Sequence, residues 1–245
     1  MALGKECSVR YLILFFLLAA TGCQKHTDQQ ETKAMATATA PKEILAGNIS
    51  FNAQSGEIKY TLPQAALVRI RIGLKDGGPL LRNLVDWEKR EKGEHTEIWD
   101  KKDASGKVNF GNRTDFMLVL ACLPLNTKER NSYSGAIKGF RKSPRLSITF
   151  PEGTEKNEKG MSVLKEVVPV RISLGEKDKW IIETKYELGM FIDNIFLMED
   201  EEGSNPFTYQ LNTKGLNEGG HVITVNMIGY EGEIGTESAL VEVKK

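Results

Sequence analysis

The stretch GEIKYTLPQAALVRIRIGL, residues 56–74, alternates apolar and polar side chains on both sides of a Leu-Pro turn. The apolar positions are Ile58, Tyr60 and Leu62 before the turn, and Val68, Ile70 and Ile72 after it. A period of two residues is typical of a β-strand that buries one face. We therefore expect two strands here, with Arg69 and Arg71 on the solvent-exposed face of the second.

The same pattern recurs along the rest of the chain in short runs separated by Gly, Asn, Asp and Pro. These runs cover residues 95–100, 115–123, 145–150, 167–174, 220–230 and 238–245. The run DFMLVLACL (115–123) is apolar almost throughout, as in a strand in the middle of a sandwich. We expect it to form a hairpin with residues 145–150 across a long loop. Since no long helical period is found, the sequence predicts an all-β fold.

The charged segment PEGTEKNEKG follows Phe150 and contains no apolar side chain apart from its first proline. Such a segment indicates a boundary between domains. We therefore expect two tandem β-sandwiches of the immunoglobulin-like or fibronectin III-like type, over residues 44–150 and 164–245, joined by a linker at 151–163. Each half has the length of a small sandwich.

The N-terminal segment has a basic start and then a short apolar run, which is the pattern of a secretory signal peptide. The run is too short for a transmembrane helix, which needs about 20 apolar residues. It ends in AATGC, which resembles the lipobox of bacterial lipoproteins. The resemblance implies that residues 1–22 are removed and that Cys23 is acylated; an ordinary cleavable signal is the alternative. Residues 23–43 are polar and Ala/Thr-rich, so we expect a flexible tether.

Two further resemblances concern the predicted sandwiches. IKYTLPQAALVRIRI, LLRNLVD and KGEHTEIWDKKDASGKV resemble the immunoglobulin-like domain of the flagellar hook-capping family, over residues 56–123. FIDNIFLMEDEEGSNPFTYQLNTKGLNEGGHVITVNMIGYEGEIG resembles the immunoglobulin-like repeats of bacterial surface proteins, over residues 165–243. In both families the matching residues have framework roles, so the resemblances imply no catalytic residue.

Composition narrows the choice of partners and cofactors. Lys plus Arg equals Asp plus Glu at 33 each, so no basic excess indicates binding to nucleic acid. Cys122 lies in an apolar run, where we expect a small buried side chain. We expect no cofactor and no metal site, since the histidines are scattered. The acidic loop DKKDASGK could hold calcium, but a hairpin turn is the favoured interpretation.

Two sets of residues are candidates for binding. The segment IKGFRKSPR (137–145) places basic side chains around an aromatic one, which suits an acidic partner, a lipid headgroup or a polyanionic glycan. Its candidate residues are Lys138, Phe140, Arg141, Lys142 and Arg145. Trp87 and Trp180 are candidates for a glycan-binding platform, whereas Trp99 is expected in the core.

These observations predict a non-enzymatic, lipid-anchored protein on the periplasmic or outer face of a bacterial envelope. Gln24, in place of the aspartate that marks inner-membrane retention, favours the outer membrane. The expected role is an accessory or assembly module that presents its sandwiches to another envelope protein. The alternative is a glycan-binding or adhesin module. A hydrolase is disfavoured, because no nucleophile elbow or paired-carboxylate motif is found.

Overall fold

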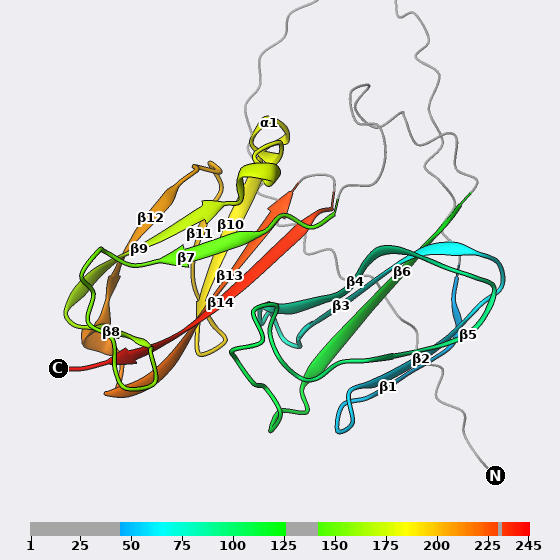
Figure 1. The fold of residues 1–245 in the computed structure, drawn as a ribbon, viewed down its shortest axis with the longest axis horizontal. Coiled ribbons are helices and arrows are strands. Elements are labelled where there is room, and N and C mark those ends of the chain that lie inside the picture. Colours follow the sequence, from blue (N-terminus) through cyan, green and yellow to red (C-terminus); the bar gives the residue numbers. More distant parts are fainter. Residues whose placement is uncertain (1–44, 126–141, 230–231) are drawn as a thin grey trace, which may run out of the picture. The chain divides into compact units, whose positions relative to one another are not determined.

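The computed structural model describes residues 45–125, 142–229 and 232–245, which belong to one compact unit (Figure 1). The N-terminal signal, Cys23 and the tether lie outside the described residues, as do Lys138, Phe140 and Arg141. Within the described part, four sheets surround two hydrophobic core clusters.

The first core cluster lies between two three-stranded sheets. One sheet has the order β1-β2-β5 and the other has the order β4-β3-β6. Their strands are β1 (Gly47–Asn52), β2 (Glu57–Leu62), β3 (Ala66–Leu74), β4 (Leu80–Arg90), β5 (Gly93–Ile98) and β6 (Phe116–Pro124). The alternating side chains of β2 and β3 point into this core, and Trp99 is almost fully buried in it. The predicted strands at 56–74 are confirmed.

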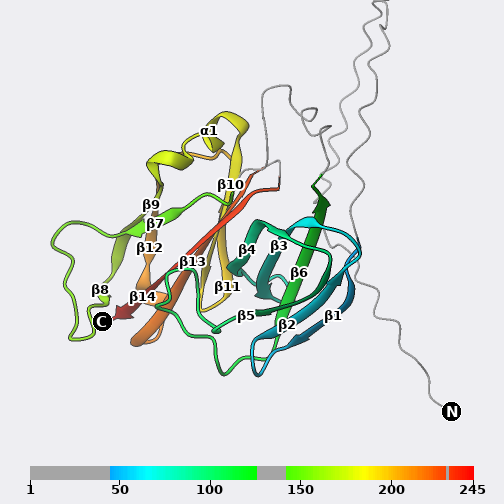
Figure 2. The same ribbon diagram turned by 45° about the vertical axis from the view of Figure 1, so that its right-hand side comes forward.

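The second core cluster lies between a three-stranded sheet, β12-β9-β7, and a five-stranded sheet, β11-β10-β13-β14-β8 (Figure 2). Their strands are β7 (Leu146–Thr149), β8 (Ser162–Leu164), β9 (Val167–Leu174), β10 (Tyr186–Ile192), β11 (Ile195–Asp200), β12 (Phe207–Asn212), β13 (Gly219–Gly229) and β14 (Ile234–Val243). A single-turn helix, α1 (Ile181–Thr184), and two short 3₁₀ turns, at Glu176–Asp178 and Thr213–Gly215, complete the described elements.

The all-β prediction is confirmed, because sandwiched sheets make up the described structure and helix is confined to single turns. Cys122 is buried, as predicted. The predicted turn at Asp103 is also confirmed: Gly106 N donates to Asp103 O at 3.2 Å, with Gly106 at φ +74°.

The predicted hairpin between residues 115–123 and 145–150 is wrong. β7 pairs antiparallel with β9, placing Leu146 opposite Leu174 and Ile148 opposite Ile172. Leu146 consequently belongs to the second core cluster. The apolar period of β7 predicts that one face is buried, but it does not specify which strand it pairs with, and β9 offers matching apolar positions. The domain boundaries and the linker at 151–163 stay predictions.

The prediction that Arg71 lies on a solvent-exposed face is also wrong, because Arg71 is only 7% exposed. Its Nη2 donates to Gly232 O at 2.8 Å, and Arg69 Nη1 donates to the same carbonyl at 2.9 Å. Arg71 Nε donates to Asn83 Oδ1 at 3.1 Å. The face of β3 that carries Arg69 and Arg71 is therefore covered by the segment between β13 and β14, about 160 residues further along the chain.

Candidate functional site

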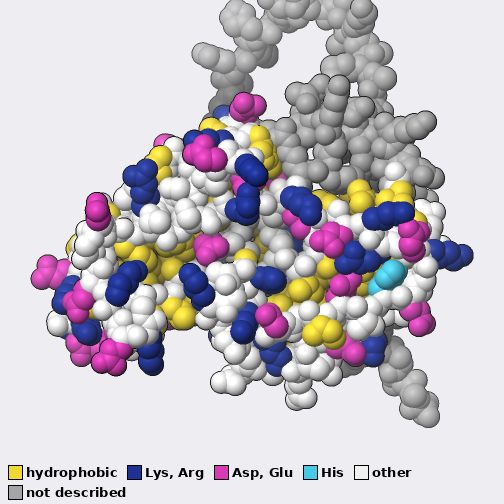
Figure 3. Space-filling model, in the orientation of Figure 1, with side chains coloured by type: hydrophobic (Ala, Val, Ile, Leu, Met, Phe, Trp, Pro, Cys, Tyr) yellow, Lys and Arg dark blue, Asp and Glu magenta, His cyan; other side chains and the backbone are white. Residues whose placement is uncertain are grey.

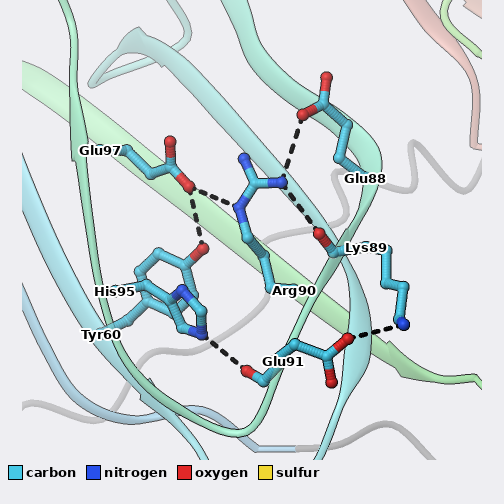
Figure 4. A network of polar contacts seen from close by, with 7 residues as sticks. All are labelled: Tyr60, Glu88, Lys89, Arg90, Glu91, His95 and Glu97. Carbon is cyan, nitrogen blue, oxygen red and sulfur yellow. Dashed lines mark hydrogen bonds and ion pairs between the residues drawn. The ribbon is translucent and has the colours of Figure 1, made fainter.

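A cluster of polar side chains joins β2, β4 and β5 (Figure 4). Tyr60 Oη donates to Glu97 Oε1 at 3.2 Å, and Arg90 Nε donates to the same oxygen at 2.8 Å. Arg90 Nη1 also donates to Glu88 Oε2 at 3.3 Å. The His95 ring stacks on Tyr60, with their centroids 5.2 Å apart. These contacts bring together residues that are distant in sequence.

The electrostatics of this cluster favour a structural role. Burial, and then the charge of Glu97, raises the pKa of Tyr60, so the phenol stays protonated and donates its hydrogen. The hydrogen bond to Glu97 raises the pKa of Arg90 despite some burial. His95 Nε2 contacts Glu91 O at 2.7 Å. The cluster thus contains a phenol and a guanidinium that are held by one carboxylate, and it links three strands of the first core.

His221 and Asp193 form a second polar pair, between β13 and the turn from β10 to β11. His221 Nδ1 lies 2.6 Å from Asp193 Oδ2, and Nε2 lies 2.8 Å from Asn217 O. Asp193 Oδ1 accepts from Val222 N at 3.0 Å, with Asp193 itself at φ +50°. Both ring nitrogens therefore have partners, and the pair fixes the turn onto β13. Both residues belong to framework motifs of the sequence, but those motifs did not predict that they meet.

The pKa of His221 is raised on balance. Burial disfavours the charged ring, but the hydrogen bonds to Asp193 and to the Asn217 carbonyl outweigh that effect. A histidine that is held in this way stabilises the fold more in its charged form. A general base requires a ring nitrogen that is free to accept a proton. Both ring nitrogens of His221 already have hydrogen-bond partners.

The two tryptophans proposed for glycan binding lie in different parts of the fold. Trp87 is on β4 at φ +53°, half-buried, with the Arg69 guanidinium 4.3 Å from its ring centroid. Trp180 precedes α1 and packs against the second core cluster. Trp87 therefore lies on a strand of the sheet β4-β3-β6, whereas Trp180 lies beside the second core cluster, and the glycan-binding role stays a prediction.

Two of the five residues proposed in the basic segment are described. Lys142 is exposed. Arg145 Nε lies 3.4 Å from Asp178 Oδ2, and Arg145 N donates to the same carboxylate oxygen at 3.1 Å. Asp86 Oδ2 accepts from Ser143 N at 2.5 Å, which attaches this part of the chain to β4. Arg145 is thus at least partly engaged in holding β7 beside the 3₁₀ turn at Glu176–Asp178.

Polar side chains or carbonyls of β13 and β14 contact β4 in the sheet β4-β3-β6, and no motif in the sequence predicts these contacts. Leu80 N donates to Asn226 Oδ1 at 2.8 Å, and Asn226 Nδ2 donates to Leu80 O at 2.9 Å. Thr236 Oγ1 also donates to Leu80 O at 2.8 Å. Asn83 Nδ2 donates to Ile234 O at 2.7 Å. Thr224 and Asn226, which alternate with the core residues Ile223 and Val225 along β13, are thus buried as well.

The described residues contain neither a metal-binding cluster nor a membrane-spanning helix. Among residues 45–125, 142–229 and 232–245, no group of three or more His, Cys, Asp or Glu side chains is placed to hold a metal ion. Asp103 is nearly fully buried, and its carboxylate accepts from Val108 N at 2.9 Å and Ser105 Oγ at 2.6 Å. No helix in those same ranges is long and apolar enough to cross a bilayer.

No family model matches the sequence, and no curated protein matches it. Among solved structures, the chain is similar to the fibronectin(III)-like modules of CbhA from Clostridium thermocellum, with 9% identity, a TM-score of 0.29, and 82% of this chain and 94% of that chain covered. It is also similar to a bacterial ice-binding adhesin, with 10% identity, a TM-score of 0.27 and coverage of 84% and 67%. An endo-β-1,4-mannanase from Thermotoga petrophila has 15% identity and a TM-score of 0.29; 48% of this chain is covered, but only 22% of the mannanase.

Proposed function

We propose that this chain is a non-enzymatic, lipid-anchored envelope protein that presents immunoglobulin-like sandwiches to a partner protein in an accessory or assembly role. The anchor is Cys23, by resemblance to the lipobox, and residues 24–43 form the tether. The resemblances to the hook-capping domain and to bacterial surface repeats are part of the same proposal.

The observation that supports the non-enzymatic role is that the titratable side chains of the two polar clusters are engaged in contacts between strands and turns of the fold. Glu97 is occupied by Tyr60 and Arg90, and His221 is held through both ring nitrogens. These contacts join strands, so the groups that most resemble catalytic pairs support the framework. A catalytic base needs access to a substrate proton, and an imidazole whose two nitrogens are both hydrogen-bonded lacks that access.

A second observation supports presentation by a rigid body. Asn226, Thr236 and Arg71 make hydrogen bonds that connect strands of the two core clusters. On the face drawn in Figure 3, Lys and Arg side chains are interspersed with Asp and Glu. Such a mixed surface suits contact with another protein better than with nucleic acid.

The test combines anchoring with partner recovery. The C-terminally tagged chain and its Cys23→Ala variant would be compared for incorporation of an alkyne-labelled fatty acid, for membrane fractionation and for crosslinking in native membranes. We expect label, membrane retention and one defined envelope protein with the parent chain, and loss of all three with Cys23→Ala.

Retention of the label by the variant would contradict the anchor. If the label is lost but no protein is recovered from the parent chain, the presentation role fails while the anchor stands. Binding on a glycan array that is lost in Trp87→Ala or Trp180→Ala would then favour the glycan-binding alternative.

A further inference from the structure

A hollow of about 280 Å³ lies between turns that belong to the two parts of the fold. The β3–β4 turn and the segment before β6 line it from the side of the first core cluster, and the β10–β11 turn and the start of β11 line it from the side of the second. All of its lining residues belong to the ranges that the structure describes. Small-molecule sites occur preferentially where separately packed parts of a fold meet, and this volume lies near the lower end of their usual range.

Two apolar side chains at the start of β11 form one part of the lining. Ile195 is 73% exposed and Phe196 is 55% exposed. The ring of Phe196 packs edge-to-face against buried Phe191, with the ring centroids 5.8 Å apart and an interplanar angle of 76°. The aromatic ring is thus supported from below while more than half of the residue stays exposed. Such a ring offers an apolar surface to a ligand.

The side chains from the β3–β4 turn and from the segment before β6 make another part of the lining polar. Lys75 and Arg113 are basic and Asp76 and Asp115 are acidic, so their formal charges cancel. Arg113 Nε donates to Asp115 Oδ1 at 3.0 Å, and its Nη2 donates to Asp115 Oδ2. Both side chains of this pair are partly exposed. The pair therefore presents N–H donors beside carboxylate acceptors.

Hydrogen bonds hold the turns around the hollow in place. Lys75 N donates to Asp115 O at 3.0 Å, which joins the β3–β4 turn to the segment before β6. Asp193 Oδ1 accepts from Val222 N at 3.0 Å, which joins the β10–β11 turn to β13. A site whose walls are fixed before binding loses little freedom when the ligand enters.

We propose that this hollow binds a neutral saccharide, with one pyranose ring stacked on Phe196 and its hydroxyl groups hydrogen-bonded to Arg113 and Asp115. A pyranose has an apolar C–H face and a rim of hydroxyls, which matches a lining that is apolar in one part and polar in another. Each hydroxyl can both donate and accept, as the paired guanidinium and carboxylate require.

The charges and the size of the hollow restrict the ligand further. Because the four charged side chains balance, the site has no net attraction for an anion or a cation. The volume suits a ligand of about one sugar ring rather than a larger molecule. Neither Trp87 nor Trp180 lines the hollow, and the proposal depends neither on the lipid anchor nor on a partner protein.

The first test measures binding by the full chain, kept in a detergent that has no sugar headgroup. The chain is screened on an array of neutral and acidic glycans, and the dissociation constant of the best neutral glycan is measured by calorimetry. We expect Phe196→Ala and Arg113→Ala each to weaken binding at least about tenfold, whereas Phe196→Trp keeps the aromatic surface and should still bind. Ile182→Ala is the matched control, because Ile182 is 42% exposed on α1, at the other end of β10 (Figure 1), and it should bind like the parent chain.

The second test locates the bound sugar. The chain is labelled with ¹³C at the isoleucine δ1 methyl groups and titrated with the same glycan, and Ile195→Val and Ile182→Val assign the two methyl signals. We expect the Ile195 signal to shift as the glycan is added, since Ile195 lines the hollow. The Ile182 signal should stay where it is.

Four results would overturn the proposal. The first is a parent chain that binds no glycan or only acidic ones. The second is equal affinity of the parent chain and Phe196→Ala. The third is binding that is kept in Phe196→Ala but lost in Trp87→Ala or Trp180→Ala, which would place the sugar elsewhere. The fourth is loss of a crosslinked envelope protein in Phe196→Ala without any glycan binding, which would make the hollow a protein contact.

Discussion

Replacing Asn226 by alanine should destabilise the fold more than its single side chain suggests. Asn226 is 5% exposed, and its amide donates to and accepts from the backbone of Leu80 as a neighbouring strand would. It also donates to Thr236 Oγ1 at 3.0 Å. Alanine removes all three contacts and offers no replacement.

The magnitude follows from which groups lose their partners. Leu80 O keeps its hydrogen bond from Thr236, so it stays satisfied. Leu80 N–H loses its acceptor in a partly buried position, which costs about 1–3 kcal/mol. Loss of the two bonds that Asn226 donates adds roughly 1 kcal/mol. We expect Asn226→Ala to lower the free energy of unfolding by about 2–4 kcal/mol, a large share of the roughly 5–15 kcal/mol of a typical domain.

Urea denaturation followed by tryptophan fluorescence measures this loss. Asn212→Ala is the control, because Asn212 is exposed and its Oδ1 accepts a single bond from Lys214 N at 3.0 Å, which should cost about 1 kcal/mol. Asn226→Asp keeps an acceptor for Leu80 N but sets a carboxylate against Leu80 O, so it should be no more stable than the alanine variant. A loss for Asn226→Ala no larger than that of Asn212→Ala would refute the reasoning.

Three further predictions concern pH and backbone conformation. The pKa of His221 is raised in the folded state above its unfolded value of about 6.5. The stability that this shift provides is therefore fully present below about pH 6.5 and is lost as the pH rises through the folded pKa. The melting temperature should fall over this pH range, and His221→Gln should remove that fall. Burial, and then the charge of Asp103, raises the pKa of Glu237 to about 6 despite the opposing effect of Lys107, so stability should decrease as the pH rises from about 4.3 to that value, and Glu237→Gln should abolish this decrease. Gly56→Ala should cost more than Gly106→Ala in denaturant titrations: both glycines have φ +74°, but only at Gly56 would the added Cβ lie 2.0 Å from Trp99 O, so equal losses would contradict this explanation.

The sequence allowed us to predict the strands in which apolar and polar side chains alternate. Ile58, Tyr60 and Leu62 point into the core as their alternation indicated, and so do Ile223 and Val225 on β13. The prediction succeeds at these positions because the burial of one face of a strand is visible in the alternation of residues that are neighbours in the sequence.

The sequence did not predict contacts that depend on distant segments. A run such as RLSITF shows that one face is apolar, but the choice of β9 over β6 as its neighbour is made by the whole fold. Arg71 looked solvent-exposed because arginine usually is, and nothing near it in the sequence shows that Gly232 O covers it. The pairing of Asp193 with His221 could not be predicted either, because the two residues lie 28 positions apart in the sequence. Of the proposed site residues, Trp87, Trp180, Lys142 and Arg145 could be placed, yet their binding roles stay predictions.

The contacts between the two core clusters also set a time order during synthesis. Arg71 and Gly232 are separated by 161 residues, and Leu80 and Asn226 by 146. At about 5–20 residues per second, β3 is made roughly 8–30 s before the carbonyl that accepts from its arginine. For that interval the first sheet pair lacks the strands that cover Arg71, Asn83 and Leu80. A chain that ends before β13 would therefore lack the segment that covers Arg71, Asn83 and Leu80, and one sheet of its first core would be left uncovered.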